Sequence, residues 1–207
     1  VIIYYRASIV LLTQDFFSSI STRKMQGDSF LAWGVLLGTI PVSLAGLFFN
    51  NYVEMNLRNF QVVAYATIFF GLALGLSDLV HRVRGINREV IGGSDILIVG
   101  CAQALALIPG TSRAGITITA ALLIGLSRKL SIKFAFLLSI PVISIATLMK
   151  LFELSNEFQQ VNWILLLFGF AIAFLTSYFT IVFFIKLVER IGFFPFVVYR
   201  IFLGVLI

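Results

Sequence analysis

Long apolar runs joined by short polar connectors make up most of the chain. A helix that crosses the hydrocarbon core of a bilayer needs about 20 mainly apolar residues, and four of the runs meet this length. They occupy residues 30–49, 61–80, 134–152 and 162–187. Pro41 and Pro141 interrupt two of them, which a membrane helix tolerates when neighbouring helices satisfy the freed carbonyl groups. The pattern predicts an all-α polytopic membrane protein.

The two ends of the chain are less regular. Residues 7–28 mix polar and apolar positions, and we expect them to lie at the membrane interface. The opening VIIYYR begins without Met and lacks the layout of a signal peptide, so we interpret it as the last turns of a span already under way. A final apolar stretch runs to Ile207. Because no low-complexity segment or linker divides the chain, we treat residues 1–207 as a single integral-membrane domain.

Residues 96–126 form a different kind of apolar segment, with two arms around the polar break PGTS at residues 109–112. As a helix this segment reaches roughly 46 Å, whereas two bilayer crossings need about 60 Å. Pro109 removes a backbone donor and Gly110 relaxes the limits on φ and ψ, so the first arm should end at the break and the chain should reverse. Thr111 or Ser112 then caps the second arm. We therefore expect a re-entrant hairpin.

The distribution of Lys and Arg supports this topology. If the hairpin is re-entrant, Arg58 and Lys150 lie on one side of the membrane and most other basic residues lie on the opposite side. The basic side then carries Arg6, Arg23, Lys24, Arg82, Arg84, Arg88, Arg128, Lys129, Lys133, Lys186 and Arg190. Such a bias places the basic side in the cytoplasm, and a single full crossing by the hairpin would destroy it.

Composition agrees with a membrane protein. The mean hydropathy is +1.06 and only 12% of the residues are charged, outside the range of soluble globular proteins. The net charge of +6 resides in short loops rather than on one amphipathic face, which gives no reason to expect nucleic acid as a partner. The single Cys101 excludes an intrachain disulfide, and we expect it to be a buried filler.

The start of the second arm is suited to binding an anion. A helix capped by Ser or Thr offers several unpaired backbone N–H groups and the positive end of the helix dipole, which together favour a phosphate. Arg113 adds a guanidinium at this start, and Thr117, four residues on, shares its helix face. Polar groups within an apolar segment are costly unless they line a cavity. The pattern favours a functional site over a structural kink with ordinary caps.

The motif PGTSRAGIT at residues 109–117, with Gln103 six residues before Pro109, resembles the P-G-x-S-R-S-G-x-T motif of the undecaprenyl-diphosphate phosphatase family, also called the bacitracin-resistance family. Three further stretches are similar: GTIPVSLAGLFF from Gly38, FAFLLSIPV from Phe134, and ERIGFFPFVVYR at residues 189–200. Ala114 departs from the family, which has Ser there. The family's acidic E-x-x-x-E motif, with its Ser-rich stretch and His, is expected upstream of Val1.

The resemblance implies an inverted repeat of two helix–break–helix hairpins, of which residues 96–126 supply the second. It also implies hydrolysis of undecaprenyl diphosphate, a polyprenyl diphosphate lipid, to undecaprenyl phosphate and phosphate in the bacterial plasma membrane. This reaction recycles a lipid carrier for peptidoglycan synthesis and is linked to bacitracin resistance. The sequence gives no indication of the oligomeric state.

The resemblance also assigns roles to residues. Arg113 would clamp the diphosphate, N–H groups after Ser112 would cradle phosphoryl oxygens, and Thr117 would add a hydroxyl contact. Ser112 is a ligand or a nucleophile, and the absence of a nearby general base favours the ligand. The further substrate-binding candidates are Gly110, Thr111, Gly115, Gln103 and Arg200. A divalent cation, Mg or Ca, would be held by the upstream acidic motif, and this chain offers no metal ligands of its own.

Other interpretations of the polar residues stay open. A prenyl-phosphate carrier or flippase would use the same residues to bind without cleavage, and an inactive fragment is a third alternative. Asp78 and His81 could suit a metal or a proton relay, although water at the interface explains them equally. Glu153 and Glu157 repeat the E-x-x-x-E pattern but lack its sequel, so we interpret them as unrelated. Arg200 has either an anionic partner or functional task, or snorkels to the surface.

Overall fold

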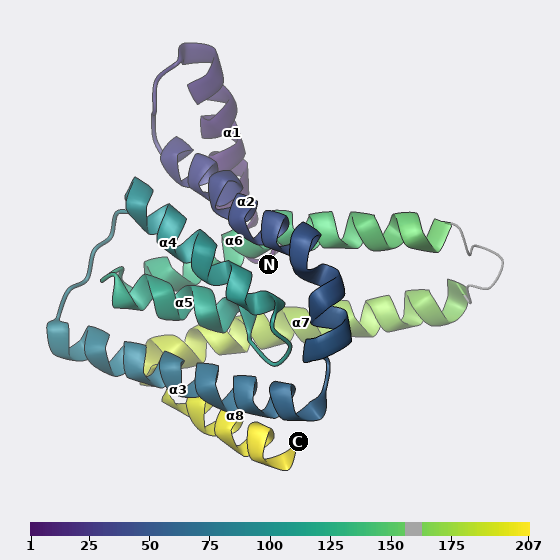
Figure 1. The fold of residues 1–207 in the computed structure, drawn as a ribbon. Coiled ribbons are helices and arrows are strands. Elements are labelled where there is room, and N and C mark those ends of the chain that lie inside the picture. The colour runs from purple at the N-terminus through teal and green to yellow at the C-terminus, as the bar shows by residue number, and fades with distance from the viewer. Residues whose placement is uncertain (156–162) are drawn as a thin grey trace.

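The computed structural model describes residues 1–155 and 163–207, which form an all-helical arrangement (Figure 1). Two short helical turns accompany the α-helices: a π-helical turn, η1 (Val53–Leu57), follows α2, and a 3₁₀ turn, η2 (Leu105–Leu107), follows α4. The α-helices are α1 (Arg6–Thr22), α2 (Ser29–Tyr52), α3 (Phe60–Arg84), α4 (Gly93–Ala104), α5 (Arg113–Leu123), α6 (Arg128–Ser155), α7 (Trp163–Ile191) and α8 (Phe194–Leu206).

Four helices are long and apolar enough to cross a membrane, and they coincide with the four predicted runs. Within α2, α3, α6 and α7 these spans are Ser29–Phe49, Phe60–Arg84, Arg128–Phe152 and Trp163–Ile191. In α7 none of the most apolar window is buried inside the protein, so its Phe and Leu side chains form an outward surface suited to lipid. The prediction of an all-α polytopic membrane protein is confirmed.

The hairpin formed by α4 and α5 lies at the centre of the fold, between α2 on one side and α3 on the other, and α8 packs against α3 (Figure 1). Glycines allow these close contacts. A Cβ at Gly100 of α4 would lie 2.9 Å from the Cα of Gly38 in α2, and one at Gly71 of α3 would lie 3.0 Å from the Cβ of Arg200 in α8. Close packing of helix backbones through small residues is typical of membrane proteins.

The first arm of the hairpin ends earlier than the sequence suggests. Helix α4 stops at Ala104 rather than at Pro109, and η2 leads into the break. Ile108, directly before Pro109, has φ −68° and ψ 120°, because a proline ring disfavours helical backbone in the preceding residue. The second arm also ends early, at Leu123, and Gly125 then turns the chain with φ +86°. A helix–break–helix is present, and its re-entrant placement stays a prediction.

Two other expectations are wrong. Residues 7–28 are mainly helical rather than an irregular interfacial segment, because α1 extends to Thr22 and packs against α2. Cys101 is exposed rather than buried, since it faces outward from α4. Regular helix begins at Arg6, and the residues before it form turns.

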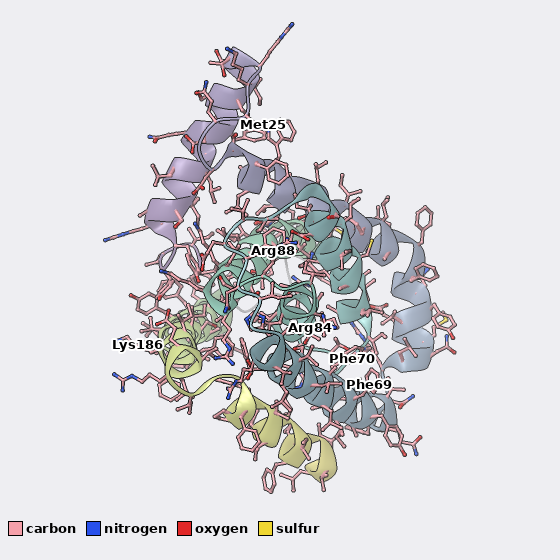
Figure 2. All side chains as sticks on the ribbon, turned by 90° about the vertical axis from the view of Figure 1, so that its left-hand side faces the viewer. Met25, Phe69, Phe70, Arg84, Arg88 and Lys186 are labelled. Carbon is pink, nitrogen blue, oxygen red and sulfur yellow. The ribbon has the colours of Figure 1, made fainter. Side chains whose placement is uncertain are left out.

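Basic residues gather at one end of the helices. In Figure 1 the ends of α3, α5 and α7 and the starts of α4, α6 and α8 lie together on the left. Figure 2 views this end directly and shows Arg84, Arg88 and Lys186 on it. Backbone hydrogen bonds tie its loops together, from Arg88 N to Gly125 O at 2.9 Å and from Ser127 N to Arg88 O at 2.9 Å. The basic loops predicted to share one side of the membrane are therefore neighbours.

Candidate functional site

The PGTS break is fixed by the packing of Gly110 against α3. Gly110 has φ +88°, a left-handed conformation that L side chains rarely adopt. A Cβ at this position would overlap the carbonyl oxygen of Val63 and lie 3.0 Å from the Val63 Cα and from the Thr67 Oγ1. Both the backbone conformation and the space therefore require glycine here.

Ser112 is the cap of α5, as one of the two predicted alternatives. Its Oγ accepts a hydrogen bond from the backbone N–H of Gly115 at 3.2 Å. The N–H of Thr111 donates to Ile108 O at 3.1 Å. The backbone N–H groups of Ser112, Arg113 and Ala114 have no hydrogen-bond partner among the described residues. Three unpaired donors at a helix start form a site suited to an anion.

A cavity of about 460 Å³ lies beside these donors, between α3, α5 and α8. Its lining combines polar groups of the break with apolar side chains. The polar part comprises Thr67, Gly110, Thr111, Ser112, Gly115 and Arg200, and the apolar part includes Leu74, Ile118, Phe184, Phe196 and Leu203. Such a lining suits an amphiphile with a charged head and a hydrocarbon chain.

Arg200 turns inward from α8 to the break. Its Nε donates to Thr67 O at 3.1 Å and its Nη2 donates to Gly110 O at 2.7 Å. The Oγ1 of Thr67 donates to the same Gly110 oxygen at 3.3 Å. A Cβ at Gly115 would lie 3.6 Å from the remaining nitrogen, Nη1, so this nitrogen is close to the first turn of α5. The guanidinium is directed into the protein and does not snorkel to the surface.

Arg113 and Thr117 lie on a different side of α5 from the cavity. Neither belongs to the lining, which takes Ala114, Gly115 and Ile118 from this helix. Arg113 is half-buried, and no hydrogen bond or ion pair joins its guanidinium to another described residue. Thr117 is fully buried, and its Oγ1 donates to Arg113 O at 2.9 Å and to Ala114 O at 3.1 Å. Their roles stay predictions, with the Thr117 hydroxyl bonded to its own helix.

Gln103 and Thr111 carry buried polar atoms without partners. Gln103 is fully buried in the last turn of α4, and neither its Oε1 nor its Nε2 forms a hydrogen bond within the described part of the chain. The Thr111 Oγ1 is in the same situation. Buried polar groups in proteins are nearly always paired, often with an ordered water or a ligand. Both residues therefore have donors and acceptors available to a bound molecule.

The acidic residues near the ends of the helices are engaged elsewhere. Asp78 is buried and forms ion pairs with Arg82 at 3.0 Å and with Arg128 at 2.6 Å. His81 is also buried, with Nε2 3.1 Å from Asn87 Oδ1, so exposure to interfacial water does not account for either residue. Asp95 pairs with Arg88. The expectation for Glu153 and Glu157 cannot be compared with the fold, because Glu157 lies outside the described residues.

The described residues do not fit a metal site. Residues 1–155 and 163–207 contain no group of three His, Cys, Asp or Glu side chains that could hold a metal ion. The cavity beside the break is also lined without a carboxylate or an imidazole. The site present in this part of the chain is therefore an anion-binding site made of backbone N–H groups and arginine.

Fold and site together define a multi-pass membrane protein with a broken-helix anion site next to an apolar cavity. The family model described as bacitracin resistance protein BacA matches residues 1–206, and the chain belongs to this family.

Similar proteins carry one function in their names. The chain is 52% identical over 205 residues to an undecaprenyl-diphosphatase of Ruthia magnifica subsp. Calyptogena magnifica, covering 99% of this chain and 77% of that protein. It is 47% identical over 206 residues to undecaprenyl-diphosphatase 2 of Stutzerimonas stutzeri (strain A1501), covering 99% and 76%. These matches extend across the hairpin, the cavity and Arg200.

Proposed function

We propose that this protein hydrolyses undecaprenyl diphosphate to undecaprenyl phosphate and inorganic phosphate in the bacterial plasma membrane. The observation that carries the proposal is the cavity beside the break, which joins unpaired backbone donors and Arg200 to an apolar wall. A polyprenyl diphosphate has the matching chemistry, with a doubly phosphorylated head and a hydrocarbon chain. Membership of the family and the names of its relatives agree with this substrate.

The break binds the head group in this proposal. The N–H groups of Ser112, Arg113 and Ala114 donate to phosphoryl oxygens, reinforced by the dipole of α5. The Nη1 of Arg200 and the guanidinium of Arg113 add positive charge at the same helix start. The apolar lining around Phe184 and Phe196 receives the first part of the prenyl chain.

The same donors lower the barrier for phosphoryl transfer. Charge spreads over the oxygens of the transferred phosphoryl group in the transition state, and preorganised donors in a site of low dielectric stabilise it without reorganising. Ser112 acts as a ligand rather than a nucleophile, because its Oγ already accepts from Gly115 N and no described carboxylate or imidazole lines the cavity to take its proton.

A divalent cation, Mg or Ca, belongs to the proposal through the family resemblance. The described residues do not supply its ligands, so no step above depends on it. A carrier or flippase is the second candidate, and the lack of a base among the residues that line the cavity favours it. The two functions differ in whether phosphate is released.

The test measures phosphate release from undecaprenyl diphosphate by the protein in detergent, with Mg, with Ca, and with a chelator. Two forms are compared: the 207-residue chain, and a chimera preceded by the N-terminal segment of a relative that carries the acidic motif. We expect release by the chimera that the chelator abolishes, and only background release by the chain alone. If both forms bind the lipid and neither releases phosphate, the carrier function is correct instead.

A further inference from the structure

Arg200 reaches the break across a large separation in sequence. It contacts Gly110, 90 residues earlier, and Thr67, 133 residues earlier, so one side chain of α8 joins α3 to the turn of the hairpin (Figure 1). Both acceptors are backbone carbonyl oxygens. The two hydrogen bonds use separate nitrogens of the planar guanidinium, whose donors are held in a fixed fork. The contact therefore fixes an orientation as well as a distance.

The residues around this contact are arranged to allow it. Gly71 leaves room for the Arg200 side chain, because a Cβ there would lie 3.0 Å from the Arg200 Cβ and 3.4 Å from its Nε. Thr67 is buried and adds its hydroxyl to the Gly110 oxygen. The Gly110 carbonyl thus accepts from two side chains on two helices.

The orientation of the Gly110 carbonyl sets the geometry of the anion site. Gly110 is two residues before the cap Ser112, and the unpaired N–H groups begin at Ser112. Because peptide units are planar, fixing the Gly110 carbonyl fixes the next peptide plane and restricts where α5 begins. Donors that stabilise a transition state must be held to well under 1 Å.

We propose that Arg200 is a positioning residue, which holds the Gly110 carbonyl together with Thr67 and thereby aims the N–H groups of α5 at the reacting phosphoryl group. This inference rests on the proposed function and deepens it. Two of the nitrogens of Arg200 are committed to carbonyl oxygens, so its main contribution is made through the break rather than through the substrate. Its loss should lower kcat more than it raises KM.

The test uses uncharged changes that act only if positioning matters. In the phosphate-releasing form, Gly71→Ala pushes on Arg200, and Thr67→Val removes the hydroxyl donor. Gly75→Ala is the matched control, since its Cβ would press on Val197 of the same helix at 3.1 Å without touching Arg200. We expect kcat to fall about tenfold for Gly71→Ala and about threefold for Thr67→Val, with KM within about twofold. Gly75→Ala should keep kcat within about twofold.

Arg200→Lys completes the set, because lysine keeps the charge but lacks the fork. We expect its kcat to fall at least tenfold, and Thr67→Val to add little in that background. A rise in KM at constant kcat for Arg200→Lys, with no effect of Thr67→Val or Gly71→Ala, would show that Arg200 acts by binding the substrate directly.

A second measurement is independent of activity. Hydrogen exchange of the backbone amides at residues 110–116 should speed up in Arg200→Lys and Gly71→Ala but not in Gly75→Ala. Unchanged exchange in all three variants would overturn the positioning role even if the wild-type protein released no phosphate. Absence of release by the wild type, with the expected exchange pattern, would instead count against the proposed function alone.

Discussion

Two arginines flank the start of α5, and the structure holds them differently. Arg200 is committed to carbonyl oxygens of the break, whereas Arg113 has no partner among the described residues although it is half-buried. A desolvated guanidinium without a partner is costly, so it is best explained by an anion that binds there. Arg113 is therefore the stronger candidate for direct contact with the diphosphate.

Substitution of Arg113 should affect catalysis far more than substitution of Thr117. Arg113→Lys keeps the charge but loses the bidentate fork, and we expect phosphate release to fall about 100-fold. Thr117→Val should cost less than about threefold, because the hydroxyl that it removes bonds only to the backbone of its own helix. Steady-state assays in the phosphate-releasing form measure both, with the exposed Arg190→Lys as control. Activity of Arg113→Lys within threefold of the wild type would remove it from this role.

The glycine of the break offers a sharp test of stability. Gly110→Ala combines strained positive φ with overlap against Val63, and we expect it to destabilise the protein by about 3 kcal/mol or more. Gly169→Ala in α7 is the control, since a Cβ there has open space and alanine favours a helix. Thermal unfolding in detergent compares the two. Equal melting temperatures would show that the break is not packed against α3.

At the scale of single residues, local sequence predicted part of the site. The break, its Ser112 cap and the shared face of Arg113 and Thr117 follow from spacing alone. Spacing could not show which side of α5 faces the cavity, since that depends on where α3 and α8 pack. Thr67 was missed because its neighbours in sequence are apolar and its partner is 43 residues away.

At the scale of elements, the ends of the helices are joined by a buried acidic residue. Asp78 of α3 binds Arg82 one turn later and Arg128 at the start of α6, with only 5% of its side chain exposed. Sequence reasoning had weighed a metal, a relay or interfacial water for this residue. The Arg128 partner, 50 residues away, was invisible to that reasoning. The four spans, in contrast, were predicted well because their signal is local hydropathy.

Removing this carboxylate should loosen the basic end of the fold. Asp78→Asn leaves two arginines without their partner, and we expect a loss of roughly 3 kcal/mol in the free energy of unfolding. The control is Glu54→Gln, whose pair with Arg58 at 3.5 Å is largely exposed and should contribute less than about 1 kcal/mol. Chemical unfolding in detergent measures both changes. Similar losses for the two variants would mean that the Asp78 pairs are as weak as a surface pair.

At the scale of the whole molecule, the positions of the charges determine topology. Arg84 and Lys129 belong to loops at the same end of the helices, and Arg84 Nη1 donates to Leu123 O at 3.3 Å across that end. With Cys101 first replaced by serine, we expect Arg84→Cys and Lys129→Cys to be labelled from the cytoplasmic side and Arg58→Cys from the other. Labelling of Arg84→Cys and Lys129→Cys from opposite sides would contradict a re-entrant hairpin.

The short arms of the hairpin have an electrical consequence. Helix α4 has 12 residues and α7 has 29, so at 1.5 Å per residue the arm extends about 18 Å and α7 about 43 Å. A head group bound at the tip of a re-entrant hairpin would then lie partway through the transmembrane voltage drop. Moving one charge through the whole drop at 100 mV is worth about 2.3 kcal/mol, so half of it changes binding about sevenfold.

Turnover in proteoliposomes should therefore depend on voltage, and the sign reports the route of entry. A diphosphate that enters from the outer face moves toward the negative interior, so an inside-negative potential should lower kcat/KM at low substrate. We expect this sign, because the family resemblance places the opening on the outer face. An increase would instead show entry from the cytoplasmic face, and turnover insensitive to a valinomycin-imposed potential would place the tip at the membrane surface.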